Sequence, residues 1–242
     1  MSVTDIWNGY ERHTFTFEGK EAFVVLPQQA DAARRWMLKT EYFGAFPDFE
    51  LAMLERGFHL AYVANDTRWH TAEDDHRKAR FAAHLAREYG LSTRCLPVGM
   101  SCGGMQAVYF AARYPQCVAA LYLDAPVLNL LSCPYGVGDA GNEFIAEFQA
   151  HTGLNLTDMI NYRNHPIDCV PALLAAQLPV MLVAGDSDTV VPFHENGAAL
   201  EALYREADGD ITVILKPGCG HHPHGLTDLT PLIDFTYRTY TA

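Results

Sequence analysis

Three histidines and a cysteine lie within six positions near the carboxyl end of the chain, in the segment CGHHPH at 219–224. Imidazole and thiolate groups bind transition metals, and an imidazole can also act as a general base. A metal site needs three or four ligands that converge at tetrahedral angles. Because His221 and His222 are adjacent on a turn stiffened by Pro223, we expect them to converge poorly. The sequence therefore predicts no metal at this segment.

A serine that could act as a nucleophile lies in the segment GMSCG at 99–103. It follows a stretch of strand character and precedes a helical one, which is the context of a nucleophile elbow. The glycines two residues before and after Ser101 leave room where a strand and a helix crowd together. At the start of that helix, the backbone N–H of Cys102 would point toward a developing oxyanion. We interpret Ser101 as the nucleophile and Cys102 as an oxyanion donor through its backbone.

A serine nucleophile needs a base, and the base needs a carboxylate that orients it. After an elbow of this kind, the three residues follow in the order Ser, Asp, His. His221 is the first histidine after the last expected strand, and Asp188 lies on the loop after the strand before it. Asp186, closer to that strand, is more typical of a turn carboxylate, and Asp124 ends an earlier strand. The sequence favours Asp188 and keeps the other two as alternatives.

Strands and helices alternate along most of the chain, which indicates an α/β fold with a mainly parallel sheet and helices on both faces. Residues 11–27 alternate apolar and polar side chains around a Glu-Gly pair and predict an N-terminal β-hairpin. Residues 127–178 interrupt the alternation and predict a small cap over the carboxyl edge of the sheet, where ligands bind in such folds. The other expected strands are 34–40, 58–64, 93–99, 118–126, 178–186 and 211–218, and the expected helices are 48–57, 74–90, 103–115, 194–209 and 231–240.

The composition limits the classes of partner. A chain of 242 residues, 49% hydrophobic and 19% charged, fits a single domain over 1–242. Its formal net charge of -12 disfavours nucleic acid and anionic membranes, and no apolar run reaches the ~20 residues of a membrane span. The amino-terminal segment lacks a signal-peptide pattern and the six cysteines include no CxxC pair, so we expect a cytoplasmic protein with free thiols. The sequence leaves open whether the chain forms a homo-oligomer.

The ordered set of motifs resembles the α/β-hydrolase superfamily over nearly the whole chain. These motifs are GMSCG at 99–103, GDSD at 185–188 and GCGH at 218–221. The loop EYFGAF at 41–46 is similar to the E-I-F-G loop of dienelactone hydrolases, whose nucleophile is a cysteine rather than a serine. That similarity implies that the backbone N–H of Tyr42 is the second oxyanion donor. The superfamily resemblance implies a hydrolase with neither a metal nor an organic cofactor.

The chain also looks like a group of bacterial α/β-hydrolases that share three further segments. They correspond here to DAPV at 124–127, VPFHEN at 191–196 and GHHPHGL at 220–226. In that group an arginine usually follows the elbow serine, whereas Cys102 takes its place in this chain. If that arginine binds an acidic substrate group, this chain has lost the contact.

These residues together predict a serine esterase that acts through Ser101, His221 and Asp188 with an acyl-enzyme intermediate. Trp69 and Phe43 belong to a set of aromatic residues expected near the carboxyl edge and are candidates for substrate contact, although packing is the favoured role for at least half of that set. We expect a small-molecule ester of modest size, such as an acylated carbohydrate. Two alternatives stay open: a non-catalytic or blocked binding protein on the same fold, and a metal-dependent hydrolase that uses the histidine cluster.

Overall fold

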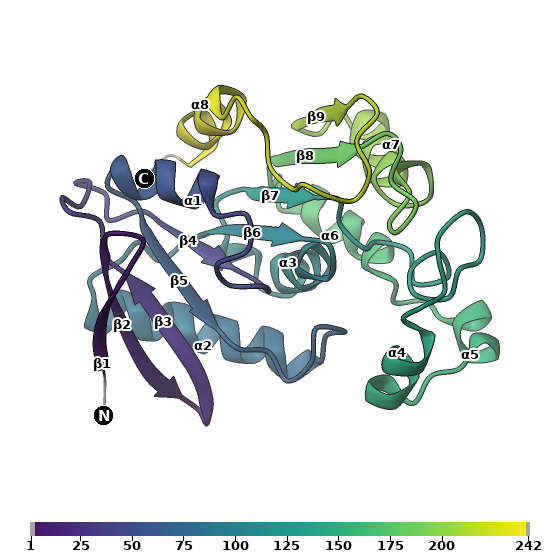
Figure 1. Ribbon diagram of the computed structural model, residues 1–242, viewed down its shortest axis with the longest axis horizontal. Coiled ribbons are helices and arrows are strands. Elements are labelled where there is room, and N and C mark those ends of the chain that lie inside the picture. Colours follow the sequence, from purple (N-terminus) through teal and green to yellow (C-terminus); the bar gives the residue numbers. More distant parts are fainter. Residues whose placement is uncertain (1–2, 241–242) are drawn as a thin grey trace.

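A nine-stranded sheet forms the centre of the computed structural model, which describes residues 3–240 (Figure 1). The strands lie in the order β1-β2-β3-β5-β4-β6-β7-β8-β9. All neighbours from β5 to β9 are parallel, and β1, β2 and β3 extend that sheet as antiparallel strands. The strands are β1 (Val3–Trp7), β2 (Tyr10–Phe17), β3 (Lys20–Val25), β4 (Trp36–Lys39), β5 (His59–Val63), β6 (Leu96–Met100), β7 (Leu121–Asp124), β8 (Val180–Gly185) and β9 (Ile211–Lys216).

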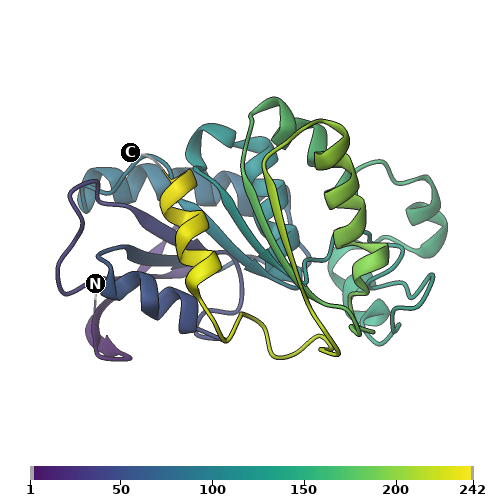
Figure 2. The same ribbon diagram turned by 90° about the horizontal axis from the view of Figure 1, so that it is seen from above.

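Helices cover both faces of the sheet (Figure 2). The helices α1 and α8 pack on one face, and α2, α3, α6 and α7 pack on the other. Within residues 3–240, no helix has both the length and the apolar character needed to cross a bilayer. The helices are α1 (Asp48–Glu55), α2 (Ala72–Glu88), α3 (Cys102–Arg113), α4 (Ile145–Thr152), α5 (Leu156–Asn161), α6 (Val170–Ala175), α7 (Gly197–Glu206) and α8 (Thr230–Thr239), with short 3-10 helices η1 (Pro115–Cys117), η2 (Pro166–Cys169) and η3 (Phe193–Glu195).

The strand β7 shows how the two faces are buried. Leu121 and Leu123 point into the core on the α3 side, whereas Tyr122 points to the other side and meets Phe49 of α1 at a ring-centroid distance of 5.1 Å. A parallel strand buried on both faces is apolar at successive positions rather than at alternate ones. This explains why the central strands were recognisable as apolar runs, and the predicted α/β-hydrolase fold class is confirmed.

The amino-terminal strands extend the predicted hairpin. The pair β2 and β3 reproduces that hairpin, with Glu18 and Gly19 at the turn, both at positive φ. The additional strand β1 pairs with β2 at the edge of the sheet. Val3 and Ile6 of β1 are 61% and 69% exposed, so this strand buries little apolar surface and carries no clear alternation in the sequence.

Residues 127–178 leave the sheet after β7 and return at β8. Figure 1 shows α4 and α5 beyond the carboxyl ends of the central strands. Phe148 of α4 and Met159 of α5 are buried in one cluster with Trp69. The last part of the segment differs, because Val170 and Leu173 of α6 pack in the main core beside α3. The portion that lies at the carboxyl edge therefore ends before α6.

Candidate active site

Ser101 sits at the tip of a tight turn between β6 and α3. Its backbone angles are φ 53° and ψ -122°, a conformation that non-glycine residues rarely adopt outside functional sites. A Cβ atom on Gly99 would lie 2.5 Å from the carbonyl oxygen of Gly103, and one on Gly104 would lie 2.4 Å from Cβ of Pro126. The glycines therefore allow the strand and the helix to meet closely enough for the serine to occupy the tip.

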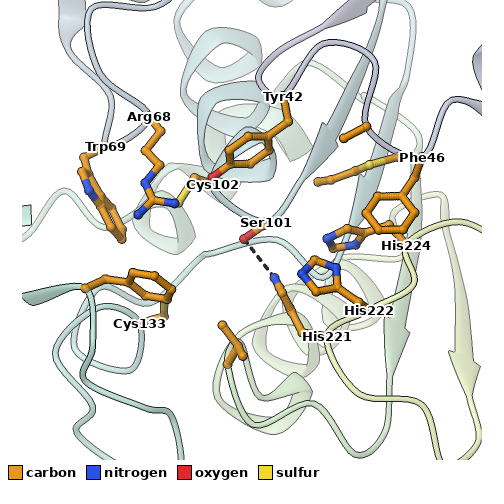
Figure 3. A pocket seen from close by; sticks show the side chains of 14 residues that line it. Tyr42, Phe46, Arg68, Trp69, Ser101, Cys102, Cys133, His221, His222 and His224 are labelled. Atoms are coloured by element: carbon orange, nitrogen blue, oxygen red, sulfur yellow. Dashed lines mark hydrogen bonds between the residues drawn. The ribbon is translucent and has the colours of Figure 1, made fainter. Parts of the chain in front are cut away.

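One chain of hydrogen bonds joins the three side chains that the sequence singles out, and Figure 3 shows the bond between Ser101 and His221. His221 Nε2 lies 3.1 Å from Ser101 Oγ, and His221 Nδ1 lies 2.7 Å from Asp188 Oδ2. An ionised carboxylate can only accept, so Nδ1 carries the proton and the lone pair of Nε2 faces the serine. Ser101 then donates its hydroxyl hydrogen to Nε2, which is the arrangement that a general base needs.

Asp188 is kept ionised by its surroundings. Burial acts to raise its pKa, but hydrogen bonds from His221 and from the N–H groups of Val191 and Val190 outweigh burial and lower the pKa of Asp188. The N–H groups of Val190 and Val191 donate to Oδ1 at 2.8 and 2.9 Å, which leaves Oδ2 to the histidine. The loop after β8 thus orients the carboxylate before any ligand binds.

The two alternative acids have other partners. Asp186 accepts a hydrogen bond from the N–H of Gly218 at 2.8 Å, so it acts as a turn carboxylate. Asp124 Oδ1 lies 2.7 Å from Nδ1 of His224, the last histidine of the cluster. Neither carboxylate is hydrogen-bonded to the histidine that faces Ser101.

The two backbone N–H groups expected to bind the oxyanion, those of Cys102 and Tyr42, differ in whether they already have a hydrogen-bond acceptor. Cys102 is the first residue of α3, so its N–H has no acceptor inside the helix and can serve a ligand. The N–H of Tyr42 lies 3.3 Å from a carboxylate oxygen of Glu41. The ring of Tyr42 lines the cavity, and burial raises the pKa of its hydroxyl, which therefore stays protonated and can donate (Figure 3). Tyr42 thus has two groups that could face an oxyanion.

A cavity of about 340 Å³ opens in front of Ser101. This volume lies at the small end of the range for ligand sites in proteins. Its walls come from the loops after β4 and β5, the elbow at 99–103, the residues near α4, and the segment 219–224, here called the histidine loop. Trp69 lies on one side of the serine, and the three histidines lie on the opposite side (Figure 3).

Of the two aromatic residues expected to contact a substrate, the structure brings Trp69 to the cavity and not Phe43. Trp69 is 3% exposed, and its indole N–H donates to Glu147 at 3.0 Å, so most of the ring packs inside the protein. Phe43 packs against Trp7 and Phe23, with ring-centroid distances of 5.2 and 4.7 Å. The expectation for Phe43 is corrected, because the aromatic rings of the amino-terminal strands offer it apolar contacts away from the cavity.

The ring nitrogens of the three histidines lie closer together than the sequence suggests. One ring nitrogen of each of His221, His222 and His224 lies within 4.8 Å of the others. Distant residues hold two of these rings: Phe46 stacks on His222 at 5.5 Å, and Asp124 bonds to His224 at 2.7 Å. The expectation of poor convergence is therefore corrected. Of the three histidines, only His221 is hydrogen-bonded to the candidate nucleophile.

Two charged residues beside the cavity were not found by sequence reasoning. Arg68 lines the cavity, and its Nε donates to Glu147 at 2.7 Å. Its guanidinium carbon lies 5.2 Å from the ring centroid of Trp69 and 5.0 Å from that of Phe144. The pair joins residues 79 positions apart, so only the fold reveals it. Arg68 places a cation beside Cys102 (Figure 3).

A family model matches most of the chain. Residues 55–235 match the model of the prolyl oligopeptidase family. The matched range includes the elbow serine, Asp188 and His221, and it excludes the amino-terminal strands.

Several solved structures share the fold. Dipeptidyl peptidase 4 of Porphyromonas gingivalis gives a TM-score of 0.69 at 14% identity, over 96% of this chain and 35% of that one. The acylaminoacyl peptidase of Pyrococcus horikoshii gives 0.72 at 14% identity, over 95% of this chain and 42% of that one. A bacterial membrane phospholipase A, described as a virulence factor, gives a TM-score of 0.60 at 18% identity, over 97% of this chain and 88% of that one. The chain thus spans less than half the length of the two peptidases, and these identities show a common fold alone.

Proposed function

Because the chain belongs to the prolyl oligopeptidase family of serine hydrolases, in the α/β-hydrolase superfamily, we propose that it hydrolyses a carboxylic ester of modest size. We assign Ser101 as the nucleophile, His221 as the general base and acid, and Asp188 as the carboxylate that orients the base. The position of His221 carries this proposal, since it bridges the serine hydroxyl at 3.1 Å and the carboxylate at 2.7 Å. A serine hydroxyl without such a base is a weak nucleophile at neutral pH.

Acylation follows from this geometry. Ser101 Oγ attacks the carbonyl carbon of the ester while its proton moves to His221 Nε2. Asp188 accepts the Nδ1–H bond throughout and stabilises the imidazolium. The charge that develops on the carbonyl oxygen faces the N–H of Cys102 and a donor of Tyr42. When the tetrahedral intermediate collapses, the alcohol leaves and takes the proton from His221.

Deacylation repeats these steps with water in place of the alcohol. His221 removes one proton from the water as the water oxygen attacks the acyl carbon of the acyl-enzyme. Collapse of the second intermediate returns that proton to Ser101 Oγ and releases the carboxylic acid. The products are one acid and one alcohol, and the side chains regain their starting protonation.

We further propose an acylated carbohydrate as the ester, bound by one domain whose segment 127–178 contributes a cap. The cavity of about 340 Å³ supports a small acyl or alcohol group. Trp69 lines the cavity, so the exposed part of its ring offers a sugar or an aromatic acid an apolar contact. The contact of Arg68 with Glu147 links the cavity wall to α4, so the cap and the site are coupled.

A second candidate substrate is the amide bond of a short aminoacyl or acylated compound. The family match favours it, because the family is named for an oligopeptidase and two of the similar structures are peptidases. The same three residues can hydrolyse an amide, with an amine in place of the alcohol as leaving group.

Unactivated substrates separate the two candidates, because activated esters report only that a serine is reactive. We expect release of acetate from acetylated methyl glycosides and little cleavage of aminoacyl naphthylamides, with both rates lost in Ser101→Ala. Faster cleavage of the naphthylamides would favour the second candidate, and cleavage that persists in Ser101→Ala would contradict the triad. Labelling of the wild-type chain by a fluorophosphonate distinguishes an active serine from a blocked binding protein.

A further inference from the structure

Three imidazole rings stand edge to face around one point beside the candidate nucleophile. The ring centroids of His221, His222 and His224 lie 4.9 Å apart in each pair, and their facing nitrogens lie within 4.8 Å of one another. Nitrogens bound to one tetrahedral zinc ion lie roughly 3.3 Å apart, because each Zn–N bond is about 2.0 Å long. Rotations that move each nitrogen by about 1 Å therefore suffice to bring the three onto one ion.

Buried carboxylates orient two of these rings. Nδ1 of His221 lies 2.7 Å from Asp188, and Nδ1 of His224 lies 2.7 Å from Asp124. Asp124 is fixed in turn by the N–H of Gly225 at 2.6 Å. Metal-binding histidines usually donate their second N–H to a carboxylate in this way, which fixes the tautomer and leaves Nε2 for the metal. The two carboxylates also supply negative charge that balances a divalent cation.

His222 supplies the third donor and has no role in the proposed hydrolysis. Its side chain is exposed and stacks on Phe46, with an interplanar angle of 14°. Within residues 3–240, its ring nitrogens have no hydrogen-bond partner. A nitrogen of His222 is therefore available to a metal without the loss of an existing bond.

We propose that His221, His222 and His224 form a binding site for Zn²⁺ that switches the hydrolase off. Three neutral imidazoles suit zinc, copper or nickel rather than calcium or magnesium, which prefer oxygen ligands. The inhibition rests on the function proposed above. The single lone pair of His221 Nε2 either accepts the proton of Ser101 or binds the metal, and it cannot do both. A bound ion thus removes the base, and its fourth position stays open to water.

A second group of possible ligands lies outside the cavity and provides a control. Asp139, His194 and Glu195 bring their ligand atoms within 4.8 Å of one another. The side chains of Asp139 and His194 are 78% and 63% exposed, and Glu195 already accepts hydrogen bonds from Asp139 N–H and the Ser132 hydroxyl at 2.6 and 2.5 Å. Glu195 therefore anchors a loop, and zinc binding there is not expected to affect hydrolysis.

Binding is measured first, without reference to activity. Titration calorimetry with Zn²⁺ should give one tight ion per chain for the wild type and for Ser101→Ala. Bound Co²⁺ should show the visible bands of four-coordinate cobalt without a thiolate charge-transfer band, because the donors are imidazoles. His222→Ala should weaken the affinity by more than about tenfold, whereas His194→Ala should not change it. No tight binding by the wild type, or equal affinity in His222→Ala, would overturn the site.

Activity then tests the inhibitory role. We expect Zn²⁺ to inhibit the wild type at the concentrations at which it binds, and EDTA to restore the rate. Each variant is compared with its own metal-free rate, and His222→Ala should need more than about tenfold more zinc. Zinc that binds without inhibiting, or that stimulates, would overturn the inhibitory role. If the metal-free wild type cleaves no substrate, the proposed function fails, whereas the calorimetry and the cobalt spectra still decide the metal site.

Discussion

Ser101 and Cys102 are adjacent at the elbow, and their surroundings give them different chemistry. Burial raises the pKa of the Cys102 thiol to about 11, so it is not a thiolate at neutral pH. Its side chain is 3% exposed and lies in a buried cluster beside Tyr42. Ser101 instead has a base 3.1 Å away. The reactive group at the elbow is therefore the hydroxyl.

Cys102→Ala should change kcat by no more than a few-fold, because the backbone N–H survives the substitution. Ser101→Ala should remove nearly all activity, since nucleophile and base act as one unit and the loss of either costs on the order of 10⁶-fold in a well-studied triad. Steady-state hydrolysis and fluorophosphonate labelling measure both variants. A loss of ~100-fold in Cys102→Ala, the size of a lost oxyanion donor, would show that the thiol itself takes part.

Tyr42 offers an oxyanion either its N–H or its hydroxyl, and one substitution separates them. The N–H lies 3.3 Å from Glu41, whereas the hydroxyl belongs to a ring that lines the cavity. We expect Tyr42→Phe to lower kcat by about 100-fold with little change in KM, because only the hydroxyl is removed. Parallel measurements on Glu41→Gln should show a smaller effect. An unchanged kcat in Tyr42→Phe would assign the role to the N–H.

At the residue scale, the sequence predicts what is encoded by local pattern and chain order. The Gly-x-Ser-x-Gly turn and the order Ser, Asp, His identify Ser101, Asp188 and His221, which the structure brings into one hydrogen-bonded chain. Arg68 and Glu147 could not be found, because their contact joins the loop after β5 to α4 and neither residue belongs to a motif. Long-range partners of this kind appear only once the chain is folded.

The elbow as an element depends on how closely β6 and α3 approach each other. A Cβ on Gly104 would lie 2.4 Å from Cβ of Pro126, whereas the nearest atom to a Cβ on Gly103 is 3.2 Å away. Gly104→Ala should therefore lower the free energy of unfolding by roughly 1–3 kcal/mol, as overpacking does, and Gly103→Ala by clearly less. Urea unfolding of the two variants compares them directly. Equal stabilities would show that Pro126 moves aside without cost.

At the element scale, prediction succeeded where burial imposes a pattern. The central strands are apolar because both faces are covered, and α2 shows its amphipathic spacing with Phe81 and Leu85 buried. The strand β1 lacks such a pattern because its side chains are mostly exposed. The helices α4 and α5 are short, with 8 and 6 residues, and bury Phe148 and Met159 against distant parts of the chain. Their positions follow from tertiary contacts that the local sequence does not specify.

On the scale of the whole molecule, Asn196 joins the segment after β7 to the start of α7. Its side-chain oxygen accepts from the N–H groups of Leu128 and Asn129, each at 2.9 Å, and the residue is 1% exposed. Asn196→Ala should lower the free energy of unfolding by roughly 1–3 kcal/mol for each buried group left unpaired. Urea unfolding should show this loss. A fully stable Asn196→Ala would mean that water replaces the amide.

The stability of the whole molecule should also depend on pH through His59, which is 2% exposed on β5. Burial, reinforced by nearby Arg34, lowers the pKa of His59 from 6.5 to about 4, against smaller opposite effects of the Arg35 backbone and Asp31. The unfolded chain therefore binds this proton below pH 6.5, whereas the folded chain binds it only near pH 4.

Stability should accordingly fall as the pH drops through that window, by roughly 3 kcal/mol in total, because each pKa unit corresponds to about 1.4 kcal/mol. Replacement by leucine removes the titrating group, and with it a ring nitrogen, His59 Nδ1, that has no hydrogen-bond partner within the described part of the chain. Urea unfolding of the wild type and His59→Leu at pH values between 7 and about 4 measures the difference. We expect His59→Leu to gain on the wild type steadily as the pH falls below about 6.5, and a difference independent of pH would show that His59 has the same pKa in the folded and the unfolded protein.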